Sequence, residues 1–454
     1  MKKGLLILIL CAIVLTAASV IAVTVLVPLI RYNQADVVLN EGRYEEAIVA
    51  FADLGDYKDS AEKLLESRYR AAEAKLNEGK YEQAMQELSE LESYRDSPDL
   101  YREARFRWGK VLMAEGAYRD SLELLLLDIE YSGVRDEIKK IYEKAVQSGE
   151  ITVAYDAATS LRDFEAITGL NLQVLAAGRN HVVALRRDGT VVAAGNNEKG
   201  QCNVQDWKDI IAVVAGFEYT VGLRSDGTVV ATGFNNNGQC DVQDWADIVT
   251  VYAGNTSTDT IGVKADGTIV AVGVGGLEGK NYHQQIPGKA DSMVKMCPGW
   301  RGILVLMEDG DVKFIPSPSD MEGVNRWMCI KDVSIGTGHA VGLMIDGTVV
   351  TAGRNTSGQN DVDGWANIIA LAASNSNTAG MKKDGTVMVA GSDKKGQKDA
   401  EKWKDIVAVS VGPGYVVGLR VDGTVVAAGQ ITRVEENEKV LEEIASWQNI
   451  GPAS

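Results

Sequence analysis

Few side chains in this chain are of the kinds that enzymes use, and their spacing matches no common catalytic motif. The 454 residues include only three histidines, His181, His283 and His339. There is no Gly-x-Ser-x-Gly elbow, no His-Glu-x-x-His pair and no phosphate-binding loop. A general base or a metal ligand needs partners at fixed distances, whereas His181 and His339 fill a repeated position that otherwise varies. We therefore expect no enzyme activity, no metal and no cofactor.

Aspartate and cysteine also recur, but in patterns that favour structural roles. Asp188 and Asp226 each precede a glycine, which is typical of tight turns, and the spacing of a calcium-binding loop is absent. The glycine-rich stretch at 273–280 fits neither nucleotide-binding motif, so it is interpreted as a loop. No Cys-x-x-Cys pair occurs, and we expect free, partly buried thiols rather than a disulfide or a metal site. The cysteines beyond the amino-terminal segment are Cys202, Cys240, Cys297 and Cys329.

Composition narrows the class of protein and of partner. The chain is 45% hydrophobic and 24% charged, as folded proteins are, and its length predicts two or three domains. Its net charge is -17. Because a nucleic-acid surface needs clustered lysine and arginine, we expect no nucleic-acid partner.

The amino terminus has the composition of a membrane segment. No charge lies between Lys3 and Arg31, so residues 4–30 are long enough to cross the roughly 30 Å of a bilayer core. We expect residues 1–31 to be a single-pass transmembrane anchor. Lysines before the span favour a short amino terminus inside and the remaining domains outside. The alternative is a cleavable signal peptide, since Ala17, Ala18 and Ser19 resemble a cleavage site.

A helical repeat follows, from 32 to 160. A glycine followed two residues later by tyrosine recurs every 37 residues, at Gly42, Gly79 and Gly116, with apolar residues at helical spacing between the copies. Each copy is predicted to be a helical hairpin whose first helix ends near the glycine. Asp59 is predicted to cap the next helix. The stretch resembles tetratricopeptide repeats, and this resemblance implies either a protein-binding solenoid or a spacer.

A different repeat occupies residues 165–454. An Asp-Gly turn between two apolar, β-branched runs occurs seven times, at intervals of 37 to 43 residues, and so predicts seven β-hairpins. A Trp-x-x-Ile element precedes most units, and its last copy, Trp447 to Ile450, has no strand after it. The first unit lacks this element. We therefore expect the carboxyl-terminal segment to lie beside the first unit and close a ring of seven blades, which removes the exposed sheet edges.

The repeat also carries a family resemblance. Ala-Gly-x-x-His, then Leu-x-x-Asp-Gly-Thr-Val, then Asn-x-x-Gly-Gln resembles regulator of chromosome condensation repeats, and the short units are similar to bacterial secreted members of that family. The resemblance implies a protein-binding propeller; we do not expect the founder's nucleotide-exchange activity. The predicted fold is a transmembrane helix, then all-α helical-hairpin repeats, then an all-β seven-bladed propeller closed by the carboxyl-terminal segment.

Function is expected where the copies differ. Antiparallel strands place two loops of every blade at one end, and aromatic and arginine side chains on a rigid platform are typical anchors of protein interfaces. The candidate binding residues are Arg179, His181, Phe217, Tyr219, Asn235, Trp300, Arg301, His339, Asn355 and Tyr415.

We expect a membrane-anchored scaffold that binds another protein or a cell-surface polymer. Two alternatives stay open: a polysaccharide-acting enzyme that uses the propeller cavity, which would need paired carboxylates or histidine near the axis, and an inhibitor of a secreted or envelope enzyme.

Overall fold

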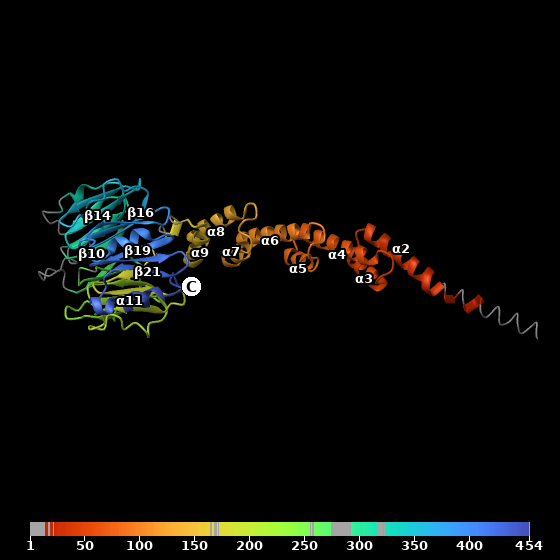
Figure 1. Ribbon diagram of the computed structural model, residues 1–454, viewed down its shortest axis with the longest axis horizontal. Coiled ribbons are helices and arrows are strands. Elements are labelled where there is room, and N and C mark those ends of the chain that lie inside the picture. Colours follow the sequence, from red (N-terminus) through yellow and green to blue (C-terminus); the bar gives the residue numbers. More distant parts are fainter. Residues whose placement is uncertain are drawn as a thin grey trace, which may run out of the picture. The chain divides into compact units, whose positions relative to one another are not determined.

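The chain divides into two compact units, Met1–Ser148 and Gly149–Ser454. The structure is a computed structural model, and it describes residues 14–16, 19–20, 22–163, 166–167, 170, 172–254, 256, 258–273, 292–300, 302–315, 321 and 323–453. The first unit is helical, and the second begins with a helix and continues as sheets (Figure 1). The sequence placed the end of the helical repeats at 160, but helix α9 (Ile151–Leu161) belongs to the second unit.

The first unit begins with a helix that is apolar at its start. A π-helical turn, η1 (Ala22–Leu26), continues into α2 (Val27–Asn40), and together they are long and apolar enough to cross a membrane, a property that signal sequences share. Residues 1–13 of the expected span lie outside the described residues. Ala35 and Leu39 are buried in the first hairpin. One helix therefore crosses the boundary expected at residue 31.

Helical hairpins make up the rest of this unit. Gly42 has φ +78°, and the backbone amide of Arg43 beyond it donates to the Val38 carbonyl at 3.1 Å. This is the hydrogen-bond pattern of a glycine helix stop, so the predicted role of this glycine is confirmed. The helices are α3 (Tyr44–Leu54), α4 (Ser60–Asn77), α5 (Tyr81–Glu90), α6 (Ser97–Ala114), α7 (Tyr118–Leu126) and α8 (Val134–Ser148).

The prediction that Asp59 caps α4 is wrong. Its carboxylate makes no capping bond and instead accepts a hydrogen bond from the Tyr32 hydroxyl at 2.5 Å. The next repeat has the same arrangement, in which the Tyr69 hydroxyl donates to Asp96 at 2.5 Å. The aspartate oxygen that the sequence assigned to the helix cap therefore bonds instead to a tyrosine two helices earlier, Tyr32 of α2 or Tyr69 of α4.

The second unit contains seven three-stranded antiparallel sheets in the described chain, each in sequence order, and we number them 1 to 7. This is the arrangement expected of a propeller. The strands are β1 (Leu175–Ala177), β2 (His181–Leu185), β3 (Val191–Gly195); β4 (Ile210–Ala215), β5 (Tyr219–Arg224), β6 (Val229–Gly233); β7 (Ile248–Ala253), β8 (Thr260–Lys264), β9 (Ile269–Val272); β10 (Met293–Gly299), β11 (Gly302–Met307), β12 (Val312–Ile315); β13 (Ile330–Ile335), β14 (His339–Met344), β15 (Val349–Gly353); β16 (Ile368–Ser374), β17 (Asn377–Lys382), β18 (Val387–Gly391); and β19 (Ile406–Gly412), β20 (Tyr415–Arg420), β21 (Val425–Gly429).

The Asp-Gly turns and the tryptophans each have a packing reason. In sheet 2, the Asp226 carboxylate accepts from the Thr228 amide at 2.9 Å, which holds the hairpin. A Cβ added to Gly222, in the middle strand, would lie 2.8 Å from the Trp207 ring. The same pairing of glycine and tryptophan recurs in sheets 3, 5, 6 and 7. Sheet 4 has no tryptophan before β10 and carries Val305 in place of the glycine.

The carboxyl-terminal segment repeats the backbone contacts that link successive sheets. In a regular link, a residue with positive φ precedes the first strand of a sheet, and its carbonyl accepts a hydrogen bond from an amide in the hairpin of the same sheet. In sheet 2, the Asp209 carbonyl accepts from the Ser225 amide at 2.9 Å. Asn449 also has positive φ (+58°), and its carbonyl accepts from Arg187 of sheet 1 at 2.9 Å. The amide of Ile450 donates to Gly423 of sheet 7 at 3.1 Å. The segment thus bonds to both the last and the first sheet.

Two of the described α-helices pack against the sheets within this unit. Helix α11 (Val434–Ala445) contacts the outer strands β21 and β3. Helix α9 lies at the hairpin side, where Asp156 forms an ion pair with Arg187 and Arg162 forms one with Asp405. Tyr155 of α9 is only 3% exposed. These contacts with the sheets explain why α9 belongs to this unit rather than to the helical repeats.

Candidate functional site

Each sheet has two chemically different ends. We call the end with the Asp-Gly turns the hairpin end, and the end with the loops between first and second strands the loop end. The loop after the third strand also lies at the loop end, because the amide of Phe234 donates to Glu218 at 2.9 Å and that of Arg354 donates to Gly338 at 2.7 Å. Both loop sets therefore meet at one end, as the topology predicted.

Four of the expected binding residues are buried, which corrects the expectation that they form a surface. His181, Tyr219, His339 and Tyr415 are each 0% exposed. Each ring folds back over the glycine three residues earlier: a Cβ on Gly216 would lie 1.9 Å from the Tyr219 ring. In sheet 6, where Asn377 replaces the ring, the glycine is replaced by Ser374. Ala-Gly-x-x-His is therefore a packing motif.

These rings connect neighbouring sheets through hydrogen bonds. His181 Nε2 lies 3.0 Å from the Thr220 hydroxyl, and His339 Nε2 is equally far from that of Thr378. Because each threonine hydroxyl donates its proton to a carbonyl oxygen, the histidine Nε2 must be the donor to the threonine. Burial lowers the pKa of both histidines to about 4, so both rings are neutral near pH 7.

The two candidate asparagines are exposed, but their amides brace their own loops. Asn235 donates to Asp241 at 2.8 Å and accepts from the Cys240 amide at 2.7 Å. Asn355 donates to Asp361 at 2.8 Å and accepts from the Asn360 amide at 2.9 Å. A ligand that bound either amide side chain would compete with these loop contacts.

Three candidates remain available at the loop end. Arg179 is exposed, and its guanidinium lies 4.3 Å from the centre of the half-buried Phe217 ring. It also pairs with Glu218 at 3.4 Å. Trp300 of sheet 4 is 36% exposed, and Arg301 lies outside the described residues. Arg179, Phe217 and Trp300 have the chemistry of interface anchors.

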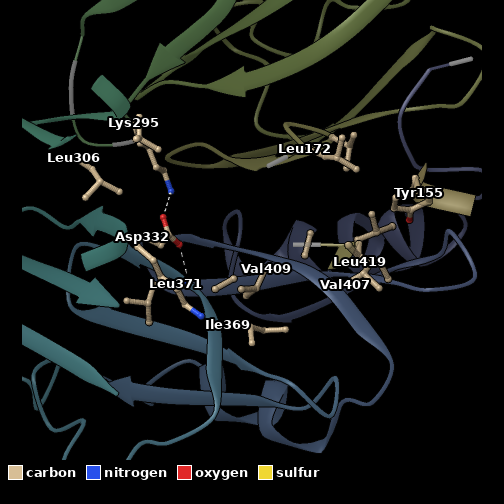
Figure 2. Close-up of a pocket in the computed structure, with 16 residues that line it drawn as sticks. Tyr155, Leu172, Lys295, Leu306, Asp332, Ile369, Leu371, Val407, Val409 and Leu419 are labelled. Atoms are coloured by element: carbon tan, nitrogen blue, oxygen red, sulfur yellow. Dashed lines mark hydrogen bonds and ion pairs between the residues drawn. The ribbon is translucent and has the colours of Figure 1, made fainter. Parts of the chain in front are cut away.

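Two cavities lie among the first strands. The axial cavity, of about 220 Å³, is lined by residues from the first strands of all seven sheets. The hairpin-end cavity, of about 490 Å³, is lined by residues of β10, β13, β16 and β19 together with Tyr155 and Leu172 (Figure 2). Lys295 and Leu371 line both cavities.

One ion pair, between Lys295 and Asp332, forms part of the wall of the hairpin-end cavity. The Lys295 ammonium lies 2.7 Å from Asp332, whose second carboxylate oxygen accepts from the Leu371 amide at 3.3 Å (Figure 2). Asp332 is the single carboxylate that lines either cavity among the described residues. Paired acids, as a glycosidase would need, are therefore not found there. In the same part of the chain, no group of three or more His, Cys, Asp or Glu residues could hold a metal.

The ion pair was missed from sequence, although the repeats contain its signal. Lys295 and Asp332 occupy the same place in consecutive first strands, opposite Leu306 and Leu343. That place is held elsewhere by Ala212, Thr250, Ala370 and Ala408. Opposite charges at one repeat position indicate a polar contact between adjacent sheets.

The cysteines are all free in the described chain, as expected. Cys202 and Cys240 are buried, and burial raises the pKa of each thiol to about 12. At neutral pH both are protonated and therefore poor nucleophiles.

Comparison with known proteins identifies the repeat. The model of the regulator of chromosome condensation (RCC1) repeat matches residues 175–201, 210–239 and 330–359. A search of curated proteins gave no significant match.

Solved structures with related folds include the CRINKLY WD40 ectodomain of the Arabidopsis thaliana receptor kinase ACR4, at 14% identity, 57% of this chain, 95% of that chain and a TM-score of 0.47. Another is Prp20p from Saccharomyces cerevisiae, at 16% identity, 64% of this chain, 78% of that chain and a TM-score of 0.32. At these identities the likeness concerns the fold alone.

Proposed function

Because the chain carries regulator of chromosome condensation repeats, we propose that it is a membrane-anchored, non-catalytic scaffold that binds another protein through the loop end of a closed seven-bladed propeller. The observation that carries the proposal is the exposed Arg179 guanidinium over the half-buried Phe217 ring of the neighbouring sheet. A cation stacked on an aromatic ring is a rigid anchor of the type found at interface hot spots.

Three contacts between the last and the first sheet support closure of the ring. The Tyr415 hydroxyl of sheet 7 lies 2.8 Å from the Gly178 carbonyl and 2.7 Å from the His181 carbonyl, both in sheet 1. The amide of Ala177 in β1 donates to the Ser410 hydroxyl of β19 at 3.1 Å. The axial cavity, which all seven first strands line, also fits a ring.

The exposed side chains at the loop end support a binding role. Within the sheet unit, α9 packs at the hairpin end, through the contacts of Asp156 and Arg162. The loops at the other end carry the side chains that differ most between repeats. Arg179, Phe217 and Trp300 are exposed or half-buried there, and the other sheets do not carry the same side chains at these places. Such differences suit the recognition of one partner by one sector of the ring.

The amino-terminal helix supports anchoring. The helix of Ala22–Asn40 meets the length and composition of a membrane span, and the segment before it is uncharged back to Lys3. We propose that the short amino terminus lies inside and that the chain beyond the membrane-spanning helix lies outside. Proteolysis of intact cells tests this orientation, because protection of everything after Arg31 would contradict it.

Recovery of a partner by matched variants tests the binding face. The full chain, solubilised from membranes, is cross-linked and captured as wild type, as an Arg179→Ala, Phe217→Ala, Trp300→Ala variant, and as a Met328→Ala, Ile345→Ala control. Met328 and Ile345 are 67% and 66% exposed, and Ile345 lies in a turn at the hairpin end. We expect a partner that wild type and control retain but that the triple variant loses at least tenfold, as for hot-spot truncation. Equal recovery by all three proteins would contradict the proposed face.

A further inference from the structure

The hairpin-end cavity has the features of a small-molecule site. Its volume is about 490 Å³, and aliphatic side chains form most of its lining. Small-molecule sites are usually concave, mostly apolar and equipped with a few polar groups that orient the ligand. We propose that this cavity binds a carboxylate with an apolar body, whose carboxylate pairs with Lys295 and whose body lies against the aliphatic wall.

The polar group in this cavity departs from the repeat. Five of the seven sheets place an alanine, a threonine or a valine where Lys295 and Asp332 stand. The surrounding repeats show that the fold does not require charge at this place. This ion pair, whose side chains are 27% and 21% exposed, is weak as a stabilising device. Its presence in two adjacent sheets, on the wall of the hairpin-end cavity, therefore points to a ligand.

Charge selects an anion. The lining contains two lysines, Lys295 and Lys331, and one carboxylate, Asp332, which leaves an excess of one positive charge. Burial alone lowers the pKa of Lys295, but the charge of Asp332 raises it above its ordinary value, so the amine stays protonated. An ammonium has three donors. One donates to Asp332 at 2.7 Å, and the others have no partner among the described residues, so a carboxylate can accept from them.

A second polar residue of the lining comes from α9. Tyr155 lines the cavity, is 3% exposed, and its buried hydroxyl has no hydrogen-bond partner in the described part of the chain. Figure 2 places Tyr155 and Leu172 across the cavity from Lys295. Buried hydroxyls are normally satisfied, so this one is ready to bond a polar atom of a ligand. The ligand would then touch both α9 and β10.

Calorimetric titration of the full chain tests the proposal. Decanoate is the probe with a straight apolar chain, and 2-naphthoate is the probe with an aromatic ring system. Decanol is the uncharged analogue of decanoate. Partitioning into detergent is the same for every variant, so differences between variants report on the cavity. We expect wild type to bind at least one of the two carboxylates more tightly than decanol.

The decisive variant is Lys295→Met with Asp332→Asn, which removes both charges together and leaves an acceptor for the Leu371 amide. We expect its affinity for the carboxylate to fall at least tenfold, as for loss of a charged hydrogen bond. Tyr155→Phe should weaken binding by a few-fold. Lys208→Met, an exposed lysine before β4, is the matched control and should bind as wild type. Absence of carboxylate binding by wild type, or equal binding by the double variant, would overturn the proposal.

Discussion

At the scale of single residues, the repeated rings act within the protein and not on its surface. His181, Tyr219, His339 and Tyr415 start the second strand of their sheets, and each is fully buried over a small residue. The residue type at this position varies between sheets because different side chains can fill the same internal space, and not because the position recognises a partner. Tyrosine and histidine both fit, provided that a glycine stands three residues before them.

The buried histidines make stability depend on pH. Each has a pKa of about 4 in the folded protein, against about 6.5 when unfolded. Between these values the unfolded state binds more protons, so stability is full above about pH 6.5 and falls as the pH drops towards 4. The loss for each histidine is at most about 3 kcal/mol.

A double variant, His181→Tyr with His339→Tyr, tests this source of acid sensitivity. Tyrosine fills the same position in Tyr219, beside a threonine of the next sheet, so it should be accommodated. Urea midpoints followed by tryptophan fluorescence from pH 7 to pH 4 should fall less steeply in the variant than in wild type. Parallel curves would show that other groups, such as the turn aspartates, cause the acid sensitivity.

At the scale of elements, the helical repeats are joined by an aromatic layer at each turn. The rings of Tyr69 and Tyr94 meet edge to face with centres 6.0 Å apart, and Arg95 lies over both. In the next repeat, Phe106 replaces the tyrosine that would donate, and Gly133 replaces the aspartate that would accept. Donor and acceptor disappear together, which indicates that they act as a pair.

A double-mutant cycle on Tyr69→Phe and Asp96→Ala measures this pair. Removing the hydroxyl should lower the free energy of unfolding by about 1 kcal/mol, the usual value of such a hydrogen bond. We expect the two losses to be non-additive by about 0.5 to 1.5 kcal/mol, because both substitutions delete one interaction. Additive losses in the urea midpoint would show that the tyrosine and aspartate act independently. Tyr118→Phe, on the third repeat, serves as the control.

At the scale of the whole molecule, the carboxyl-terminal segment should decide whether the sheets form one cooperative body. Removal of residues 447–454 deletes the backbone bonds of Asn449 and Ile450 to sheets 1 and 7. Two sheet edges would then lack these partners, and exposed edges promote aggregation. We expect lower solubility and a broader urea transition.

Removal of residues 452–454 alone is the matched control, since it spares Asn449, Ile450 and Gly451. It should behave as the intact chain. If the longer deletion left solubility and the urea transition unchanged, the proposed closure of the ring would be wrong.

The sequence by itself determined the local elements of this protein. Asp-Gly turns, glycine helix stops and apolar periodicity act within a few residues, so the repeats, the helical hairpins and the seven β-hairpins could be predicted. The tertiary structure decided what each side chain meets. It buried His181 and Tyr219 between sheets, directed the Tyr32 hydroxyl to Asp59, and paired Lys295 with Asp332. Each of these contacts joins segments that are distant along the chain. Such contacts depend on how separate elements pack. In a single sequence, the only sign of them is a residue that departs from the repeat.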